Sequence, residues 1–338
     1  MKQRKERRMI PASLFYLIFA FALFEPAPVF AEPLRIAYTS IAIVFAPLWT
    51  TEEAGIFKKH GLDVELLYIG GGPPSTQALL AGDVKISFTA AGAVVAANLA
   101  GSDVVLLGTT ADTLPFEIWS VPTIRVPEQL KGTRMGVTRI GATSDFVGRY
   151  VLKKWGLKPG SDVVIFQTGA GPEVFAALKG GSIQSGVMSM GPYTIEAERQ
   201  GFVRLADVST MGLAYAYGPF AALGSFIRSQ PDVVRRFMRA YVEGIHRFKT
   251  DKHFALATLE KHTRLKTTPA TERVYDIFIQ RYLKRVPEAT AEDIQTILDE
   301  IAASRPLPAG VTPQRFVEPR FINEIVTSGF ADSLYRER

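Results

Sequence analysis

The sequence of 338 residues contains no cysteine. This absence excludes disulfide bridges, cysteine-ligated zinc or iron–sulfur centres, a thiol nucleophile and a lipid anchor on an N-terminal cysteine. Histidine is scarce too, because the chain has four and none belongs to a His-Glu-x-x-His motif. Neither a Gly-x-Ser-x-Gly elbow nor the Gly-Lys-Ser/Thr end of a phosphate loop occurs. We therefore expect no catalytic residue, no metal site and no cofactor.

Long apolar runs are also rare, and the one present lies at the N-terminus. Ile10 to Phe24 is almost wholly apolar, follows a basic segment and precedes a proline-containing segment that ends in Val29-Phe30-Ala31. These features are typical of a secretory signal peptide cleaved before Glu32, with small residues at positions −3 and −1. The run is shorter than the roughly 20 residues that span a bilayer. We therefore expect residues 1–31 to be removed, with an uncleaved membrane anchor as the alternative.

Without residues 1–31, the chain has only a small excess of positive charge. The whole chain carries a formal charge of +6, of which the five basic and two acidic residues of that segment supply half. A mildly basic remainder without blocks of like charge gives no reason to expect nucleic acid as a partner. At roughly 150 residues per domain, the remainder is long enough for two cores. We expect a monomer that diffuses freely in the periplasm.

Short β-branched runs alternate with helical patterns along the first two thirds of the chain, which favours parallel βαβ units. Leu34–Thr39 is predicted as a strand and Val44–His60 as a helix that Gly61 ends in a left-handed conformation. The pattern then repeats, since Gly156 and Gly181 lie 95 and 99 positions after Gly61 and Gly82. We therefore predict two lobes of similar construction.

The last third is predicted to be mainly helical. Phe220–Ile227 is predicted as a strand, and Pro231 begins a strong amphipathic helix. We expect these helices to lie on the first lobe, so that the chain crosses between lobes near residues 110–122 and 211–219. Lobe 1 then comprises residues 32–115 and 218–338, and lobe 2 comprises residues 116–217.

Several blocks of this sequence resemble a known family. Glu53-Ala54-Gly55-Ile56-Phe57-Lys58-Lys59-His60-Gly61-Leu62 and Ala78-Leu79-Leu80-Ala81-Gly82-Asp83-Val84 are similar to signatures of the substrate-binding proteins for nitrate, sulfonates, taurine and thiamine precursors. Leu130–Val137 and Ser229–Phe237 resemble later blocks of that family, over about residues 33–250 in all. The resemblance implies an α/β, two-lobed type II periplasmic-binding-protein fold, each lobe a mainly parallel sheet flanked by helices. It also implies a small-molecule solute and a transiently docked ABC permease as partners.

Candidate ligand-binding residues follow from the rule that parallel sheets bind ligands beyond the carboxyl ends of their strands, where helices begin. Small and hydroxylated residues at these ends admit a ligand to the backbone, and aromatic residues at strand ends and crossovers could form an apolar wall. The candidates are Tyr38, Ser40, Gly72, Ser75, Thr89, Ala91, Thr110, Thr143, Ser144, Met190 and Tyr215. Each hydroxyl could instead serve only as a helix cap. Arg139 and Asp145 could pair with a charged ligand, pair with each other or face solvent.

The sequence therefore predicts a periplasmic receptor that closes on a small organic solute, such as a sulfonate, a carboxylate or a pyrimidine-like compound. The scarcity of lysine and histidine at the candidate site argues for an organic anion or zwitterion held by backbone amides. Two alternatives stay open: an exported lyase or hydrolase on the same frame, and a receptor that serves a sensor protein.

Overall fold

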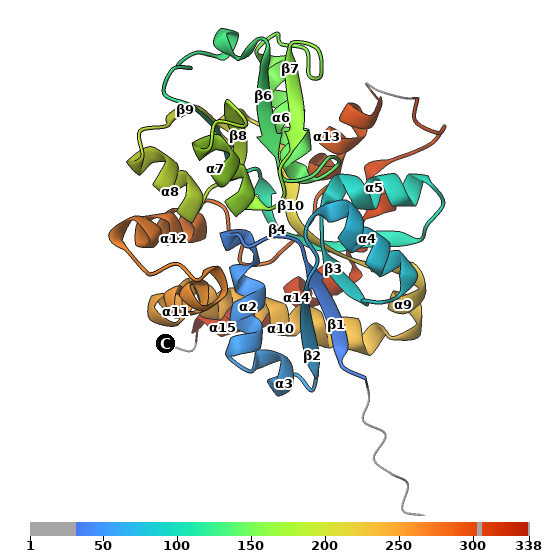
Figure 1. Ribbon diagram of the computed structural model, residues 1–338. Helices are drawn as coiled ribbons and strands as arrows, with labels where there is room; N and C mark the ends of the chain where they lie inside the picture. Colours follow the sequence, from blue (N-terminus) through green and yellow to red (C-terminus); the bar gives the residue numbers. More distant parts are fainter. Residues whose placement is uncertain (1–31, 303–305, 337–338) are drawn as a thin grey trace, which may run out of the picture. The chain divides into compact units, whose positions relative to one another are not determined.

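A computed structural model describes residues 32–302 and 306–336 of the chain (Figure 1). The expected signal peptide, residues 1–31, lies outside the described residues. The chain from Leu34 onward forms one compact unit, and the following description concerns that unit. No helix among the described residues combines the length and the apolar character that crossing a membrane requires.

Within the described residues, the first sheet has five strands in the order β2-β1-β3-β10-β4. Their bounds are β1 Leu34–Tyr38, β2 Val64–Tyr68, β3 Ile86–Phe88, β4 Val104–Thr113 and β10 Ala214–Leu223. β1 pairs in parallel with β2 and β3, whereas β10 pairs antiparallel with β3 and β4. β1, β2, β3 and β4 therefore point the same way, and their carboxyl ends share one edge of the sheet.

The second sheet repeats this arrangement in the order β7-β6-β8-β5-β9. Its strands are β5 Phe116–Ser120, β6 Thr133–Val137, β7 Val163–Gln167, β8 Ser185–Ser189 and β9 Val203–Asp207. β6 pairs in parallel with β7 and β8, and β5 runs against its neighbours β8 and β9. β6, β7 and β8 each begin 99 residues after β1, β2 and β3, respectively. The predicted fold class, two mainly parallel sheets with flanking helices, is confirmed.

Helices connect these strands in both sheets (Figure 1). They are α2 Ala46–Glu53, α3 Ile56–Lys59, α4 Gly72–Ala81, α5 Ala91–Leu99, α6 Thr143–Lys154, α7 Gly171–Lys179 and α8 Pro192–Arg199. Gly61 and Gly82 have positive φ angles after α3 and α4, as expected for glycines that end helices. The predicted continuous helix Val44–His60 is wrong, because Gly55 adopts a left-handed conformation and separates α2 from α3.

The chain passes between the sheets twice. It leaves the first sheet at the end of β4, and after Leu114 and Pro115 it enters the second sheet as β5. It returns between β9 and β10, over residues 208–213, which overlaps only partly with the expected range 211–219. β10 is the returning strand, so the predicted strand Phe220–Ile227 is placed too late: pairing with β4 already begins at Ala214, and α9 (Gly224–Ser229) follows.

The C-terminal third is helical, as predicted. It contains α10 Pro231–Thr250, α11 Lys252–Thr263, α12 Pro269–Arg281, α13 Ala291–Ala302, α14 Arg320–Thr327 and α15 Phe330–Arg336. α10 lies so close to α2 that a Cβ on Gly244 would stand 1.8 Å from the Thr51 hydroxyl oxygen. Most of these helices contact the first sheet and its helices, while α12 also reaches α8 and the Lys153–Glu300 ion pair joins α6 to α13.

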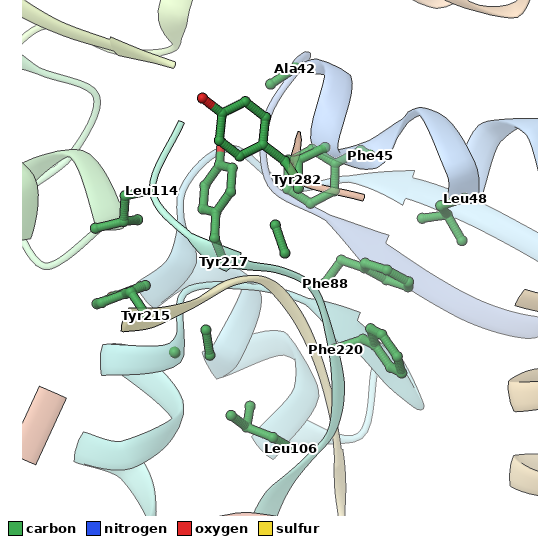
Figure 2. Packing of buried hydrophobic residues seen from close by; sticks show 14 of the residues in the cluster. Ala42, Phe45, Leu48, Phe88, Leu106, Leu114, Tyr215, Tyr217, Phe220 and Tyr282 are labelled. Atoms are coloured by element: carbon green, nitrogen blue, oxygen red, sulfur yellow. The ribbon is translucent and has the colours of Figure 1, made fainter. Parts of the chain in front are cut away.

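An aromatic cluster forms the core beneath the first sheet. Phe88 of β3 and Phe220 of β10 lie with their ring centroids 4.9 Å apart, and Phe45 lies near Phe88 (Figure 2). Phe237 and Tyr241 of α10 complete this cluster from the helical side. Burial of side chains of this size stabilises the fold by about 1.5–3 kcal/mol each. The core therefore fixes β3 and β10, whose ends border the site described next.

Candidate functional site

A pocket lies at the carboxyl ends of the parallel strands and takes residues from both sheets. We call it the central pocket. About 830 Å³ of space free of atoms lies within it, open solvent at its mouth included. Ser40 and Thr89 line it from the loops after β1 and β3, and Thr138 and Met190 line it from the loops after β6 and β8. The placement agrees with the rule for open α/β sheets.

The N-termini of α4, α5, α6, α7 and α8 border the central pocket. The residues that precede these helices as N-caps are small, and none of their side chains makes a capping hydrogen bond: Gly71, Ala90, Ala142, Ala170 and Gly191. The first N–H groups of a helix have no acceptor within the helix, and the helix dipole places partial positive charge there. Prolines in the first turns of α4, α7 and α8 supply no N–H group, but each of the five uncapped helix starts also has residues that do, and these N–H groups suit an anion.

None of the described residues that line the central pocket carries a charged side chain. Its polar groups are hydroxyls and backbone amides, and its apolar part includes Phe45, Phe116, Val187 and Met190. An anion bound here would be neutralised by N–H dipoles and not by a fixed counter-ion. An apolar body attached to that anion would find hydrocarbon and aromatic partners in the same pocket.

Some of the hydroxyls that line the pocket form hydrogen bonds with neighbouring protein groups and so stabilise its walls. The Thr89 hydroxyl donates to the Gly72 carbonyl oxygen at 2.9 Å and contacts the Thr76 hydroxyl at 3.0 Å. In the second sheet, the Ser144 hydroxyl accepts from the Thr138 amide at 3.0 Å and contacts the Thr138 hydroxyl at 2.7 Å. These bonds tie the start of one helix to the strand end beside it, so they fix the directions of the exposed N–H groups.

Tyr217 of β10 lines the pocket next to the crossing between the sheets, with its ring 5.1 Å from that of Phe116. Burial raises the pKa of the Tyr217 hydroxyl above its ordinary value near 10, and an interaction with the Ser189 side chain opposes this effect. The hydroxyl therefore stays protonated at neutral pH. It can donate a hydrogen bond to a ligand, and it is a poor general base.

Six of the residues predicted from the sequence meet in the central pocket. They are Ser40, Gly72, Thr89, Thr143, Ser144 and Met190. The first three come from the first sheet and the last three from the second. Gly72 is needed for its lack of a side chain, because a Cβ there would lie 2.4 Å from the Ala90 Cβ.

The other five predicted residues lie outside the lining of this pocket. The Ser75 hydroxyl bonds the Ser87 hydroxyl at 2.7 Å, and the Thr110 hydroxyl bonds the Tyr241 hydroxyl at 2.8 Å, both within the buried core. Tyr38 contacts Trp49 and Tyr68, and buried Ala91 follows the lining residue Ala90.

The fifth, Tyr215, is almost wholly buried against Phe146, with ring centroids 4.7 Å apart. Burial raises its pKa, and its hydroxyl is directed to Thr143 and to the backbone of Gly92, whose interactions oppose that effect. Its position is therefore behind the start of α6 and not in the pocket.

Phe116 and Thr138 line the pocket but were not among the candidates. Thr138 could have been found from the repeat, because it lies 99 positions after Thr39, which also lines the pocket. The backbone agrees with the equivalence at the preceding residues, since Ile69 N donates to Tyr38 O at 3.0 Å and, 99 positions later, Thr168 N donates to Val137 O at 2.9 Å. Phe116 had no comparable signal, because it begins the strand directly after the first crossing.

The two repeated sheets with their flanking helices are those of the periplasmic-binding-protein fold. A solved structure from Bordetella bronchiseptica RB50 superposes with a TM-score of 0.75 at 22% identity, covering 91% of this chain and 99% of that chain. The alkanesulfonate-binding protein SsuA of Xanthomonas axonopodis pv. citri, solved with MOPS bound, gives a TM-score of 0.68 at 19% identity, covering 85% and 99%. At these identities the likeness shows the fold.

The chain belongs to the NMT1/THI5-like family, whose model matches residues 42–251. A Bacillus subtilis (strain 168) relative, named "Putative binding protein YtlA", is 25% identical over 93% of this chain and 95% of its own length. The family resemblance drawn from the sequence blocks is thereby confirmed.

Proposed function

We propose that this protein is the solute receptor of an ABC importer and that it binds a small organic anion in the central pocket. One observation carries the proposal: helix N-termini without side-chain caps meet in one pocket from both sheets, and no residue described in its lining is charged. The names of the similar proteins support it, since one is named a binding protein and another an alkanesulfonate-binding protein.

The anion is held in this proposal by backbone N–H groups of α4 and α5 on one side and of α6, α7 and α8 on the other. Because both sets contact the same ligand, binding favours the closed arrangement of lobe 1 (residues 32–115 and 218–338) over lobe 2 (residues 116–217). The apolar lining around Phe45 and Met190 favours a sulfonate or carboxylate with a hydrocarbon body over a bare inorganic ion. The closed receptor then docks transiently, as a monomer, on a permease in the inner membrane.

The pocket favours binding over catalysis. Among the described lining residues, the titratable side chains are Tyr193 and Tyr217, and burial raises the pKa of each. General acid–base chemistry at neutral pH needs a group that titrates near that pH. In the described part of the chain, no three His, Asp or Glu side chains are grouped as a metal site. An exported enzyme on this frame stays the second candidate, which a turnover assay separates from a receptor.

The proposed location is the periplasm, reached through cleavage of residues 1–31. N-terminal sequencing of the protein recovered from a periplasmic extract tests this directly. A chain that begins at Glu32 agrees with cleavage, and a membrane-bound chain that retains Met1 contradicts it.

The function is tested by a thermal-shift screen of alkanesulfonates, carboxylates and pyrimidines, followed by isothermal titration calorimetry. A ligand at 100 times its dissociation constant stabilises the folded protein by about 2.7 kcal/mol. The proposal predicts binding of at least one organic anion at one molecule per chain, with the compound recovered unchanged. Chemical conversion of the bound compound would contradict the receptor role, and the absence of binding by every anion would contradict the proposed ligand class.

A further inference from the structure

A second compartment adjoins the central pocket. It contains about 500 Å³ of empty space, open solvent included, and shares the lining residues Thr39, Ser40, Gly71 and Thr138 with the central pocket. We call it the side compartment. It adds two charged side chains that the central pocket lacks, Arg139 and Glu173.

Arg139 is half-buried, and no ion pair or hydrogen bond of its side chain occurs among the described residues. Asp145, on the following helix, is the nearby carboxylate in sequence. It is already committed, because it accepts from the Gly141 amide at 2.9 Å and pairs with Arg149 at 2.8 Å. The expected alternative in which Arg139 and Asp145 pair with each other is therefore not adopted, and the Arg139 guanidinium is left facing the compartment.

The loop that carries Arg139 is held on both sides. The Thr138 amide donates to the Ser144 hydroxyl at 3.0 Å, and the Ala142 amide donates to the Arg139 carbonyl at 3.1 Å. The side chain extends from this second-sheet loop to the first sheet, where a Cβ on Gly71 would stand 2.6 Å from the Arg139 Nε. Gly71 thus leaves the space that the guanidinium occupies between the two sheets.

We propose that the side compartment recognises a second anionic group of the solute through Arg139, so that the preferred ligand carries anionic groups at both ends of a short apolar body. This inference rests on the proposed function, because it assigns one end of the ligand to the helix N-termini of the central pocket. A guanidinium forms two parallel hydrogen bonds with a carboxylate or sulfonate, which selects for such a group. The compartment therefore sets specificity and the central pocket supplies general anion binding.

The positions of the charged side chains of Arg139 and Glu173 favour an anion over an ammonium as the second group of the ligand. Arg139 is half-buried between the sheets, whereas Glu173, in the first turn of α7, is exposed. A water-exposed carboxylate is well solvated and contributes little attraction, while a partly buried unpaired cation gains more from a partner. The exposed Glu173 therefore has little influence on which charge the compartment accepts.

The test compares two ligand series by calorimetry at constant ionic strength. The first series contains monoanions, the alkane-1-sulfonates and fatty acids of two to eight carbons. The second contains the matching dianions, the α,ω-alkanedisulfonates and dicarboxylates. The wild-type protein is compared with Arg139→Met, with Arg139→Lys, and with Arg134→Gln as control. Arg134 is an exposed arginine on β6 that lies over the Phe166 ring, so its replacement changes the net charge equally but leaves the compartment intact.

We expect at least one dianion to bind the wild type more tightly than its monoanion of equal length. Arg139→Met should weaken that dianion roughly 10- to 100-fold, the effect of losing a charge-assisted pair, and leave monoanions within about twofold. Arg139→Lys should restore part of the loss, and Arg134→Gln should bind like the wild type. Unchanged monoanion binding by Arg139→Met also shows that this variant is folded.

Three results overturn the inference. Equal loss of monoanions and dianions in Arg139→Met would mean that Arg139 holds the single head group of the ligand. An unchanged dianion affinity would remove Arg139 from the site. A wild type that binds monoanions but never prefers dianions would leave the proposed function intact and contradict the second subsite, whereas a wild type that binds neither series would contradict the proposed function itself.

Discussion

Individual hydroxyl groups of the site divide into those that hold the walls and those left for a ligand. Thr89 donates to the Gly72 carbonyl, whereas no hydrogen bond of the Ser40 side chain occurs among the described residues. Thr89→Val should lower the free energy of unfolding by about 1–3 kcal/mol, because it removes the buried hydrogen bonds of the Thr89 hydroxyl with the Gly72 carbonyl and the Thr76 hydroxyl. Ser40→Ala should change stability by less than about 0.5 kcal/mol and weaken anion binding several-fold. Urea denaturation and calorimetry measure the two effects, and a reversed pattern would contradict this division.

The titration of the site residues predicts a flat pH profile. Burial raises the pKa of Tyr217, with Ser189 opposing, and burial together with Glu173 raises that of Tyr193. Both hydroxyls are therefore protonated from pH 6 to 9, and the affinity for a sulfonate should stay within about twofold across that range. A steep dependence near pH 7 would indicate a titrating residue that the described lining does not contain.

The same buried tyrosines set an alkaline limit on stability. Since the folded-state pKa of Tyr215, Tyr217 and Tyr241 lies above the unfolded value of 10, the unfolded chain loses these protons first. Their contribution to stability is complete below pH 10 and decreases as the pH rises beyond it.

At the scale of helices and strands, the proposed anion binding depends on the helix N-termini. Ala142 precedes α6 without a capping side chain, so Ala142→Asp and Ala142→Asn should each cap the helix and raise the free energy of unfolding by up to about 1 kcal/mol. The two side chains are equal in shape and differ in charge. We expect the aspartate to weaken anion binding at least tenfold more than the asparagine does, measured by calorimetry. Equal affinities for the two variants would show that the anion binds away from α6.

The sequence allowed prediction of most elements, and six of the eleven candidate residues line the central pocket. Helix-ending glycines and alternating strands are local signals, and parallel sheets bind ligands beyond the carboxyl ends of their strands, so Ser40, Thr89 and Thr143 could be placed. Ser75 and Thr110 could not be separated from them. Whether a hydroxyl faces the pocket or the core depends on the rotation of its helix or strand against distant partners such as Ser87 and Tyr241.

For the whole molecule, the two crossings between the sheets are the expected hinge. A saturating ligand should decrease the radius of gyration measured by small-angle X-ray scattering, because the ligand contacts both lobes and favours closure. Ala142→Asp at the same ligand concentration is the matched control and should show no decrease. Binding confirmed by calorimetry with an unchanged radius would mean that the pocket accepts its ligand without closure.

The most direct measurement is a crystal structure with 3-bromopropane-1-sulfonate, in which anomalous scattering from bromine locates the hydrocarbon end. We expect the sulfonate oxygens to lie about 2.7–3.2 Å from backbone nitrogens at the starts of helices from both sheets. The bromine should lie against the apolar lining near Phe45 and Met190. A sulfonate bound only to side-chain cations, or bound elsewhere with the central pocket empty, would contradict it.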